Sequence, residues 1–131
     1  MASEKKLVLV ADDEPDAIAF VTNVLEEEFE VLGVSDGVKA LQAAKERRPA
    51  LAILDVQMPN KDGFSTFYDL RRDPATKSIP VIILTAVTER TGIRFSADAI
   101  DEYMGERPEA YVEKPIDPQK LLETARKLTS A

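Results

Sequence analysis

The stretch from Leu51 to Pro59 constrains the fold of this chain more than any other. Residues 51–54 are all apolar, and a short uninterrupted apolar run is typical of a parallel-sheet strand buried on both faces. The run ends on Asp55 and then on Met58-Pro59, and a proline cannot continue a central strand. Asp55 is therefore predicted at the carboxyl end of a buried strand, which is the edge where open α/β sheets bind ligands. An aspartate there can also simply begin a turn, so both interpretations stay open at this point.

Other short apolar runs alternate along the chain with segments of helical spacing. The expected strands are Leu7–Ala11, Phe29–Val34, the run that ends at Asp55, Ile79–Leu84 and Ala110–Glu113, and the expected helices are Asp16–Glu28, Val38–Arg47, Phe64–Arg72 and Pro118–Thr129. Such alternation predicts an α/β fold, with a doubly wound parallel sheet and helices on both of its faces. In the least readable segment, 87–108, one helical stripe is formed by Ile93, Ala97, Ile100 and Met104.

The expected helices have definable ends and apolar faces. The turn Ser35-Asp36-Gly37 is expected to cap the helix that begins at Val38, and Asp62 and Asp117 are expected N-caps, because a side-chain oxygen can accept hydrogen bonds from the free amides of a first turn. The residues expected to face the core are, in chain order, Ala17, Phe20, Val21, Val24 and Leu25; Val38, Leu41 and Ala44; Phe64, Phe67, Tyr68 and Leu70 (core and flank); and Leu121, Leu122, Ala125 and Leu128.

Composition excludes several classes of function. The 131 residues fit one domain, and the net charge of -7 argues against direct nucleic-acid binding. The chain has no cysteine and no histidine, which excludes disulfides, thiolate zinc sites and triads that use histidine. No apolar run reaches the roughly 20 residues of a membrane span, and the N-terminus lacks the apolar region of a signal peptide. We therefore expect a cytoplasmic protein with no membrane insertion.

Polar residues follow four of the predicted strands. They are Asp12 and Asp13 after the first, Asp55 after the third, Thr85 after the fourth and Lys114 after the fifth. All strands of a parallel sheet end at the same edge, so these side chains are expected to converge. Three carboxylates so close together repel one another and need a counter-charge. A hard divalent cation with oxygen ligands meets that need; Mg²⁺ suits the site, and Mn²⁺ can substitute for it.

A carboxylate can also act as a nucleophile toward a phosphoryl group and form an aspartyl phosphate. Such a transfer needs mainly in-line positioning and neutralisation of charge. Asp55 is the best candidate nucleophile, with Lys114 pairing with one phosphoryl oxygen and Thr85 donating a hydrogen bond to another. Each of these residues taken singly is more often a turn or cap residue, but their joint occurrence at one edge makes coincidence a weak explanation.

At this point the chain resembles a known family. Its motifs are similar, in order and over essentially the whole chain, to those of receiver domains of two-component response regulators. They are Asp12-Asp13, Asp55 with Met58-Pro59 and Asp62-Gly63, Thr85-Ala86 and Lys114-Pro115. The resemblance implies a CheY-like, flavodoxin-like five-stranded sheet of order 2-1-3-4-5. It implies phosphorylation of Asp55 by a sensor histidine kinase or a histidine phosphotransfer protein.

The resemblance also implies roles for single residues. Asp13 and Asp55 would bind Mg²⁺ through their side chains and Gln57 through its backbone carbonyl, while Asp12 would support the metal largely through water. Lys114 would contact the phosphoryl group, and the Lys114–Pro115 bond would be cis. Thr85 would shift toward the phosphoryl group and Tyr111 would turn inward behind it; packing of Tyr111 at a sheet edge is the structural alternative. The small side chain of Ala86 would leave the site open.

The chain departs from the family pattern between Thr85 and Lys114, where it is several residues longer. We expect an irregular helix there, with Arg90, Arg94 and Phe95 either contacting a partner or lying in a solvated insert. The expected organisation is a single receiver domain over residues 1–131, with its core at about 6–129 and no output domain. Such a domain would act through protein–protein binding with a downstream target or through a phosphorelay, as a monomer or a phosphorylation-dependent dimer. It would undergo slow autodephosphorylation but would not be an enzyme otherwise.

Two other classes of protein are alternatives. A haloacid dehalogenase-like phosphohydrolase also forms an aspartyl phosphate, but it needs an Asp-x-Asp pair after the first strand, where this chain has Asp12-Asp13-Glu14. A flavin-binding protein of the same fold needs a Ser/Thr/Gly-rich phosphate loop at that place. A receiver that binds partners without phosphorylation is disfavoured, because every acceptor-site residue is present.

Overall fold

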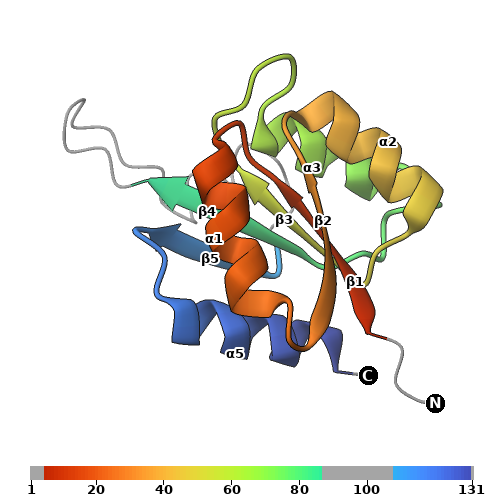
Figure 1. Ribbon diagram of the computed structural model, residues 1–131. Coiled ribbons are helices and arrows are strands. Elements are labelled where there is room, and N and C mark those ends of the chain that lie inside the picture. Colours follow the sequence, from red (N-terminus) through yellow and green to blue (C-terminus); the bar gives the residue numbers. More distant parts are fainter. Residues whose placement is uncertain (1–4, 87–107, 131) are drawn as a thin grey trace.

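The structure is a computed structural model that describes residues 5–86 and 108–130. Its elements, shown in Figure 1, are β1 (Lys6–Ala11), α1 (Pro15–Leu25), β2 (Phe29–Val34), α2 (Gly37–Arg47), β3 (Leu51–Asp55), α3 (Gly63–Arg72), β4 (Val81–Ala86), β5 (Ala110–Lys114) and α5 (Pro118–Thr129). The strands form one parallel sheet in the order β2-β1-β3-β4-β5. The predicted fold class and strand order are therefore confirmed.

The sheet is covered on both faces, which explains the uninterrupted apolar runs in its strands. Helices α1 and α5 pack on one face and α2 and α3 on the other (Figure 1). The α1/α5 layer consists of Val8, Val10, Val21, Leu25, Phe29, Leu51, Ile53, Ile82, Leu84, Val112, Leu121 and Ala125. The α2/α3 layer consists of Leu9, Ala11, Ala40, Ala44, Ala52, Leu54, Phe67, Leu70, Ile79, Val81 and Ile83. Successive strand residues alternate between the two layers, as the pleat requires.

The predicted helix caps are confirmed. The Asp36 side chain accepts a hydrogen bond from the Lys39 amide, and Asp62 accepts one from the Ser65 amide. Asp117 accepts hydrogen bonds from the amides of Gln119 and Lys120, and Pro118 occupies the first turn of α5. These carboxylates satisfy amides that have no partner within their own helix.

Two expected core positions are wrong. Val38 is 51% exposed and Phe20 is 39% exposed, because the buried stripe of each helix lies to one side of the expected one. Helix α2 packs through Ala40 and Ala44, whose small side chains let it lie close to the sheet. Tyr68 is 42% exposed and lies on the flank of α3.

Some boundaries also differ from the expected ones. Helix α1 ends at Leu25 rather than Glu28, and the side chain of Glu28 binds Arg126 of α5 instead. Strand β4 begins at Val81, two residues later than expected. Pro80 has no amide to donate, which places it before the strand. The stripe from Ile93 to Met104 and the contacts of Arg90, Arg94 and Phe95 lie outside the described residues.

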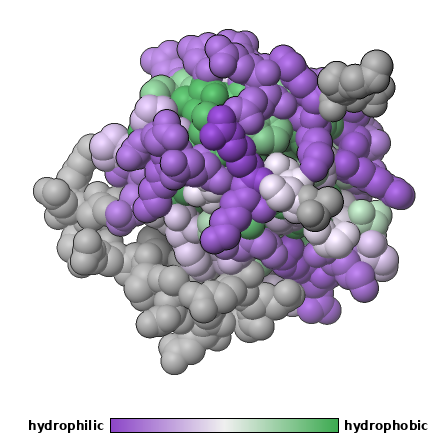
Figure 2. Space-filling view, turned by 90° about the horizontal axis from the view of Figure 1, so that it is seen from below, coloured by the Kyte–Doolittle hydropathy of each residue, from purple (hydrophilic) through white to green (hydrophobic). Residues whose placement is uncertain are grey.

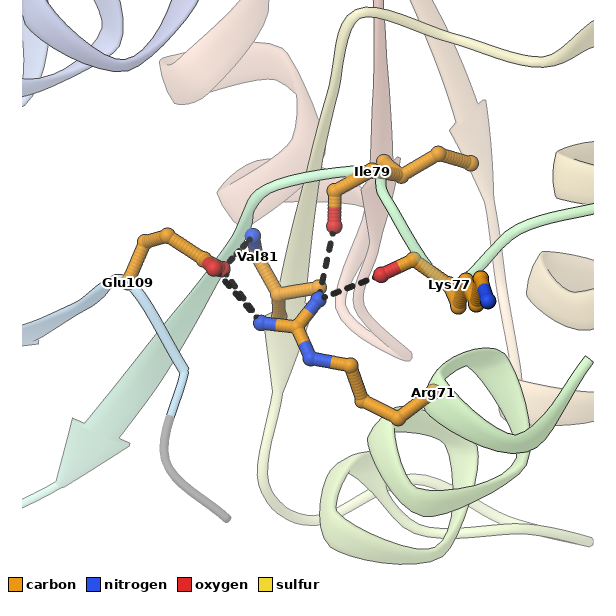
Figure 3. Close-up of polar contacts among 5 residues, drawn as sticks. All are labelled: Arg71, Lys77, Ile79, Val81 and Glu109. Carbon is orange, nitrogen blue, oxygen red and sulfur yellow. Dashed lines mark hydrogen bonds and ion pairs between the residues drawn. The ribbon is translucent and has the colours of Figure 1, made fainter. Parts of the chain in front are cut away.

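A cluster of polar contacts fixes the sheet at the end opposite its carboxyl edge (Figure 3). Arg71 of α3 donates to both carboxylate oxygens of Glu109, at 2.6 and 2.7 Å, and to the carbonyls of Lys77 and Ile79, at 3.3 and 3.0 Å. Glu109 in turn accepts from the Val81 amide at 2.7 Å. The cluster thereby joins the end of α3 to the beginnings of β4 and β5. Figure 2 shows one face of the molecule, which is mainly hydrophilic with hydrophobic areas between the polar side chains.

The buried and exposed aromatic residues of α3 provide a test of this packing. Replacing Phe67, which is 1% exposed, by alanine removes a large side chain from the α2/α3 layer and should cost about 3–5 kcal/mol of unfolding free energy. Tyr68→Ala is the matched control on the next residue; it removes only an exposed ring over which Arg72 lies, and should cost less than about 1 kcal/mol. Urea unfolding measures both, and equal losses would contradict the assigned layer.

Candidate functional site

Three carboxylates meet at the carboxyl edge of the sheet. Asp12 and Asp13 directly follow β1, and Asp55 is the last residue of β3. Each offers one oxygen within 4.8 Å of the others. Asp12 and Asp55 are buried, with 1% and 7% exposure, whereas Asp13 is exposed. The cluster is therefore embedded in the protein on one side and open to solvent on the other.

Strand geometry explains why these side chains meet. The Asp12 amide donates to Val34 at 3.1 Å, which extends the β1–β2 pairing by one residue. Asp12 continues the alternation of Val8 and Val10, and Asp55 continues that of Leu51 and Ile53, all in the α1/α5 layer. The two carboxylates consequently project on the same face of neighbouring strands.

Lys114 supplies the counter-charge from β5. Its ammonium lies 2.9 Å from Asp55 Oδ1 and 3.1 Å from Asp12 Oδ2. The other oxygen of Asp12 accepts a hydrogen bond from the Glu14 amide at 3.0 Å. Lys114 follows Val112 by two residues, so it shares the face of Asp12 and Asp55. The sequence predicted Lys114 near Asp55, and the structure adds its contact with Asp12.

The electrostatics favour a cation at this place. Burial raises the pKa of the Asp55 carboxyl; the hydrogen bond from Lys114 opposes this rise, and the charges of Asp12 and Asp13 add to it. Burial acts to lower the pKa of Lys114, but its hydrogen bonds to Asp55 and Asp12 outweigh burial and the pKa is raised. One ammonium thus serves two carboxylates, and the site retains an excess of negative charge.

This donor set fits Mg²⁺. The cation prefers carboxylate and carbonyl oxygens and keeps several of its waters, and the open side at Asp13 leaves room for them. Gln57 is exposed and, together with Asp13, Met58 and Phe64, lines a shallow groove beside the carboxylates. The residues present can therefore hold a hydrated divalent ion between the carboxylates and the β3–α3 loop, residues 56–62.

The remaining predicted site residues lie on the two strands beyond β3. Asp55 pairs with Leu84 and Ala86 pairs with Lys114, so Thr85 and Ala86 stand at the same edge as the carboxylates. Thr85 alternates with Val81 and Ile83 and so belongs to the α2/α3 face. Tyr111 is half-buried and packs on that same face, paired with Ile83. The Lys114–Pro115 bond is cis.

One link at the site was missed by sequence reasoning. The Asn60 side chain donates to the Asp36 carboxylate at 3.0 Å, which joins the β3–α3 loop to the start of α2. From the sequence, Asp36 reads only as a cap and Asn60 only as a turn residue, and no local signal pairs residues so far apart in the chain.

The fold and the carboxylate–lysine site define a CheY-like domain. The family described as response regulator receiver domain matches residues 8–126, and the chain belongs to this family. Receiver domains are phosphoacceptor signalling domains of two-component systems, and they bind Mg²⁺ at their active site. The haloacid dehalogenase-like alternative is not favoured.

Individual relatives agree with this assignment. Protein PilH of Pseudomonas aeruginosa is 32% identical over 120 residues, which cover 89% of this chain and 92% of PilH. The DNA-binding response regulator MtrA of Mycolicibacterium smegmatis is 33% identical over 129 residues, which cover 96% of this chain and 51% of MtrA. The chain thus spans about half the length of MtrA.

Solved structures agree as well. The Vibrio cholerae chemotaxis protein CheY4 superposes with a TM-score of 0.78 at 27% identity, covering 95% of this chain and 99% of that one. The receiver domain of the sensor histidine kinase PA1611 from Pseudomonas aeruginosa, solved with a magnesium ion in its active-site cleft, has a TM-score of 0.81. At 21% identity, with coverage of 98% of this chain and 100% of that one, it supports the fold. Within residues 5–86 and 108–130, no helix is long and apolar enough to cross a bilayer.

Removing the counter-charge tests the electrostatics of the site. Lys114→Met should leave Asp12 and Asp55 without their cation and lower the unfolding free energy in metal-free buffer by about 2–3 kcal/mol, somewhat less than for a fully buried pair. Addition of Mg²⁺ should recover part of the loss, because the ion replaces the missing charge.

The matched control is Lys120→Met, at an exposed position of α5, which should change the unfolding free energy little. Urea unfolding with and without Mg²⁺ measures both variants. A loss in Lys114→Met that is no larger than in the control would contradict the proposed charge balance.

Proposed function

We propose that Asp55 is the phosphoacceptor of this receiver domain and that its phosphoryl donor is a sensor histidine kinase or a histidine phosphotransfer protein. The observation that carries the proposal is the position of its carboxylate: buried at the end of β3, 2.9 Å from the Lys114 ammonium and grouped with Asp12 and Asp13. The family membership supports a phosphoacceptor at this edge.

The transfer is a substitution at phosphorus. A carboxylate oxygen of Asp55 forms the new O–P bond while the P–N bond to the donor histidine breaks, and the released imidazole takes up a proton. Asp55 must be ionised to attack, and the Lys114 ammonium favours its charged form. Mg²⁺, or Mn²⁺ in its place, held by Asp13, Asp55 and the Gln57 carbonyl and supported by Asp12, would neutralise the charge of the phosphoryl group.

The new group changes the charge balance around Lys114. Before transfer its ammonium is shared between Asp12 and Asp55; afterwards it pairs with a phosphoryl oxygen. Thr85 donates a hydrogen bond to another of these oxygens and moves toward the edge, and Tyr111 follows it because both lie on the α2/α3 face of neighbouring strands. That the small side chain of Ala86 leaves the approach to Asp55 open stays a prediction from the sequence. Phosphorylation thereby biases a two-state equilibrium.

The signal then passes to another protein. We propose that the output is protein–protein binding to a downstream target or a further phosphotransfer, by a monomer or a phosphorylation-dependent dimer. Loss of the phosphoryl group by slow autodephosphorylation resets the domain, through attack of water at phosphorus.

Phosphorylation by a small donor tests this function. Incubation with acetyl phosphate and Mg²⁺ should add the mass of one phosphoryl group to the wild type, and chelation of the metal should prevent the gain. Asp55→Asn should show no gain, because a neutral amide lacks the nucleophilic oxygen. Glu46→Gln, which neutralises an exposed acid near the end of α2, is the control and should gain the group like the wild type.

A beryllofluoride complex provides a second measurement, as an analogue of the phosphoryl group. It should change the tyrosine fluorescence of the wild type through Tyr111 and leave Asp55→Asn unchanged. If the wild type shows neither the mass gain nor the fluorescence response, Asp55 is not a phosphoacceptor.

A further inference from the structure

The two oxygens of the Asp36 carboxylate accept hydrogen bonds from different parts of the chain. Asp36 is 6% exposed, and one of its oxygens accepts from the Lys39 amide at 2.8 Å, which caps α2. Its second oxygen accepts from Asn60 Nδ2 at 3.0 Å, in the β3–α3 loop. A cap alone would need only the first of these bonds. The hydrogen bonds from the Lys39 amide and from Asn60 hold the pKa of Asp36 below its ordinary value despite burial, so it stays a charged acceptor.

Asn60 lies in a backbone conformation that needs support. Its φ is 69°, and the Lys61 amide donates to the Pro59 carbonyl at 2.7 Å, which closes a three-residue turn around Asn60. A turn of this kind with its central residue at positive φ is rare and strained, and it persists only where surrounding contacts hold it. The hydrogen bond to Asp36 is such a contact.

The packing around the loop leaves it little freedom. A Cβ on Gly37 would lie 2.2 Å from the Lys61 carbonyl oxygen, so the first residue of α2 rests directly on the loop backbone. At the loop base the Gly63 amide donates to the Val56 carbonyl at 2.9 Å. The loop is thus closed at its base and tied at its tip to α2.

Between these two anchors lies Gln57, three residues from Asn60; it lines the groove beside the carboxylates, as Asp13 does. We propose that the Asp36–Asn60 hydrogen bond holds the β3–α3 loop in the conformation that presents the Gln57 carbonyl to Mg²⁺. Asp36 and Asn60 are positioning residues: they act on the metal site through the loop and touch neither the ion nor the phosphoryl group. This inference rests on the proposed function, since it requires Mg²⁺ at the carboxylates.

Asn60→Asp tests the link. The introduced carboxylate cannot donate and faces the Asp36 carboxylate, so the loop tip should separate from α2. The dissociation constant for Mg²⁺, measured by calorimetry on the full chain, should rise about tenfold. Replacing a residue that orients a metal ligand weakens metal binding by at least about this factor. The added negative charge alone would attract the cation and strengthen binding. Weaker binding therefore cannot result from the change in charge. Asn23→Asp, which adds the same charge at an exposed position of α1, is the control and should not weaken binding.

A double variant distinguishes loss of the Asp36–Asn60 hydrogen bond from a general loss of structure. In Asp36→Asn/Asn60→Asp the donor and the acceptor are exchanged: the introduced amide still accepts from Lys39 through its oxygen and donates to the introduced carboxylate. This variant should recover most of the lost Mg²⁺ affinity. If Asn60→Asp does not fold, Asp36→Asn replaces it: its amide oxygen can still accept from the Lys39 amide, whereas its nitrogen cannot accept from Asn60.

A readout without metal completes the test. In metal-free protein, hydrogen exchange of the Lys61 amide should be faster in the single variants Asn60→Asp and Asp36→Asn and slow again in the double variant. Unchanged Mg²⁺ affinity and unchanged Lys61 exchange in the single variants would overturn this inference and leave Asp55 as the phosphoacceptor. Equal losses in Asn60→Asp and in the double variant would also overturn it. A wild type that binds no Mg²⁺ would overturn the proposed function and this inference together.

Discussion

The mutual repulsion of Asp12, Asp13 and Asp55 is the constraint on which the site depends. A parallel sheet brings its strand ends to one edge, and here three of the groups brought together carry the same charge. Lys114 balances part of that charge by bonding to two of the carboxylates at once. The remaining excess makes the edge suited to a divalent cation, which in the proposed function would also neutralise the charge of a phosphoryl group. Charge that would only destabilise an ordinary fold thus becomes the basis of phosphoryl binding.

Such a cluster needs a rigid support, because repelling groups move apart wherever the backbone allows it. Strand β3 supplies the central part of the support, since all of its residues are buried between two helical layers. At the opposite end of the sheet, the contacts among Arg71, Glu109 and Val81 fix where β4 and β5 begin. The register of these strands then determines where Thr85 and Lys114 emerge at the carboxyl edge. Precise placement of reactive groups is best achieved on such packed elements.

The sequence predicts this edge well because strand ends carry their own signals. The apolar run that stops at Asp55 marks both the strand and its last residue, and Lys114-Pro115 marks the end of the short strand that begins at Ala110. Helix faces are harder, since neighbouring stripes of α1 and α2 are both apolar; the choice of Phe20 and Val38 as core residues failed because tertiary packing selects one stripe. The bond between Asp36 and Asn60 could not be predicted, because each residue has a sufficient local role as a cap or a turn residue.

The residues of the proposed site and switch lie on different faces of the sheet. Asp12, Asp55 and Lys114 follow the alternation of the α1/α5 layer, whereas Thr85 and Tyr111 belong to the α2/α3 face. A conformational switch that begins at Asp55 would therefore have to involve residues of both faces. Thr85 is placed for this, because it lies at the edge, one residue after Leu84, the partner of Asp55 in β4. In the proposed switch, Thr85 near the end of β4 and Tyr111 near the start of β5 would move together, because their strands are paired. The proposed signal thus passes from Asp55 to β4 and β5 through neighbouring strands of the sheet.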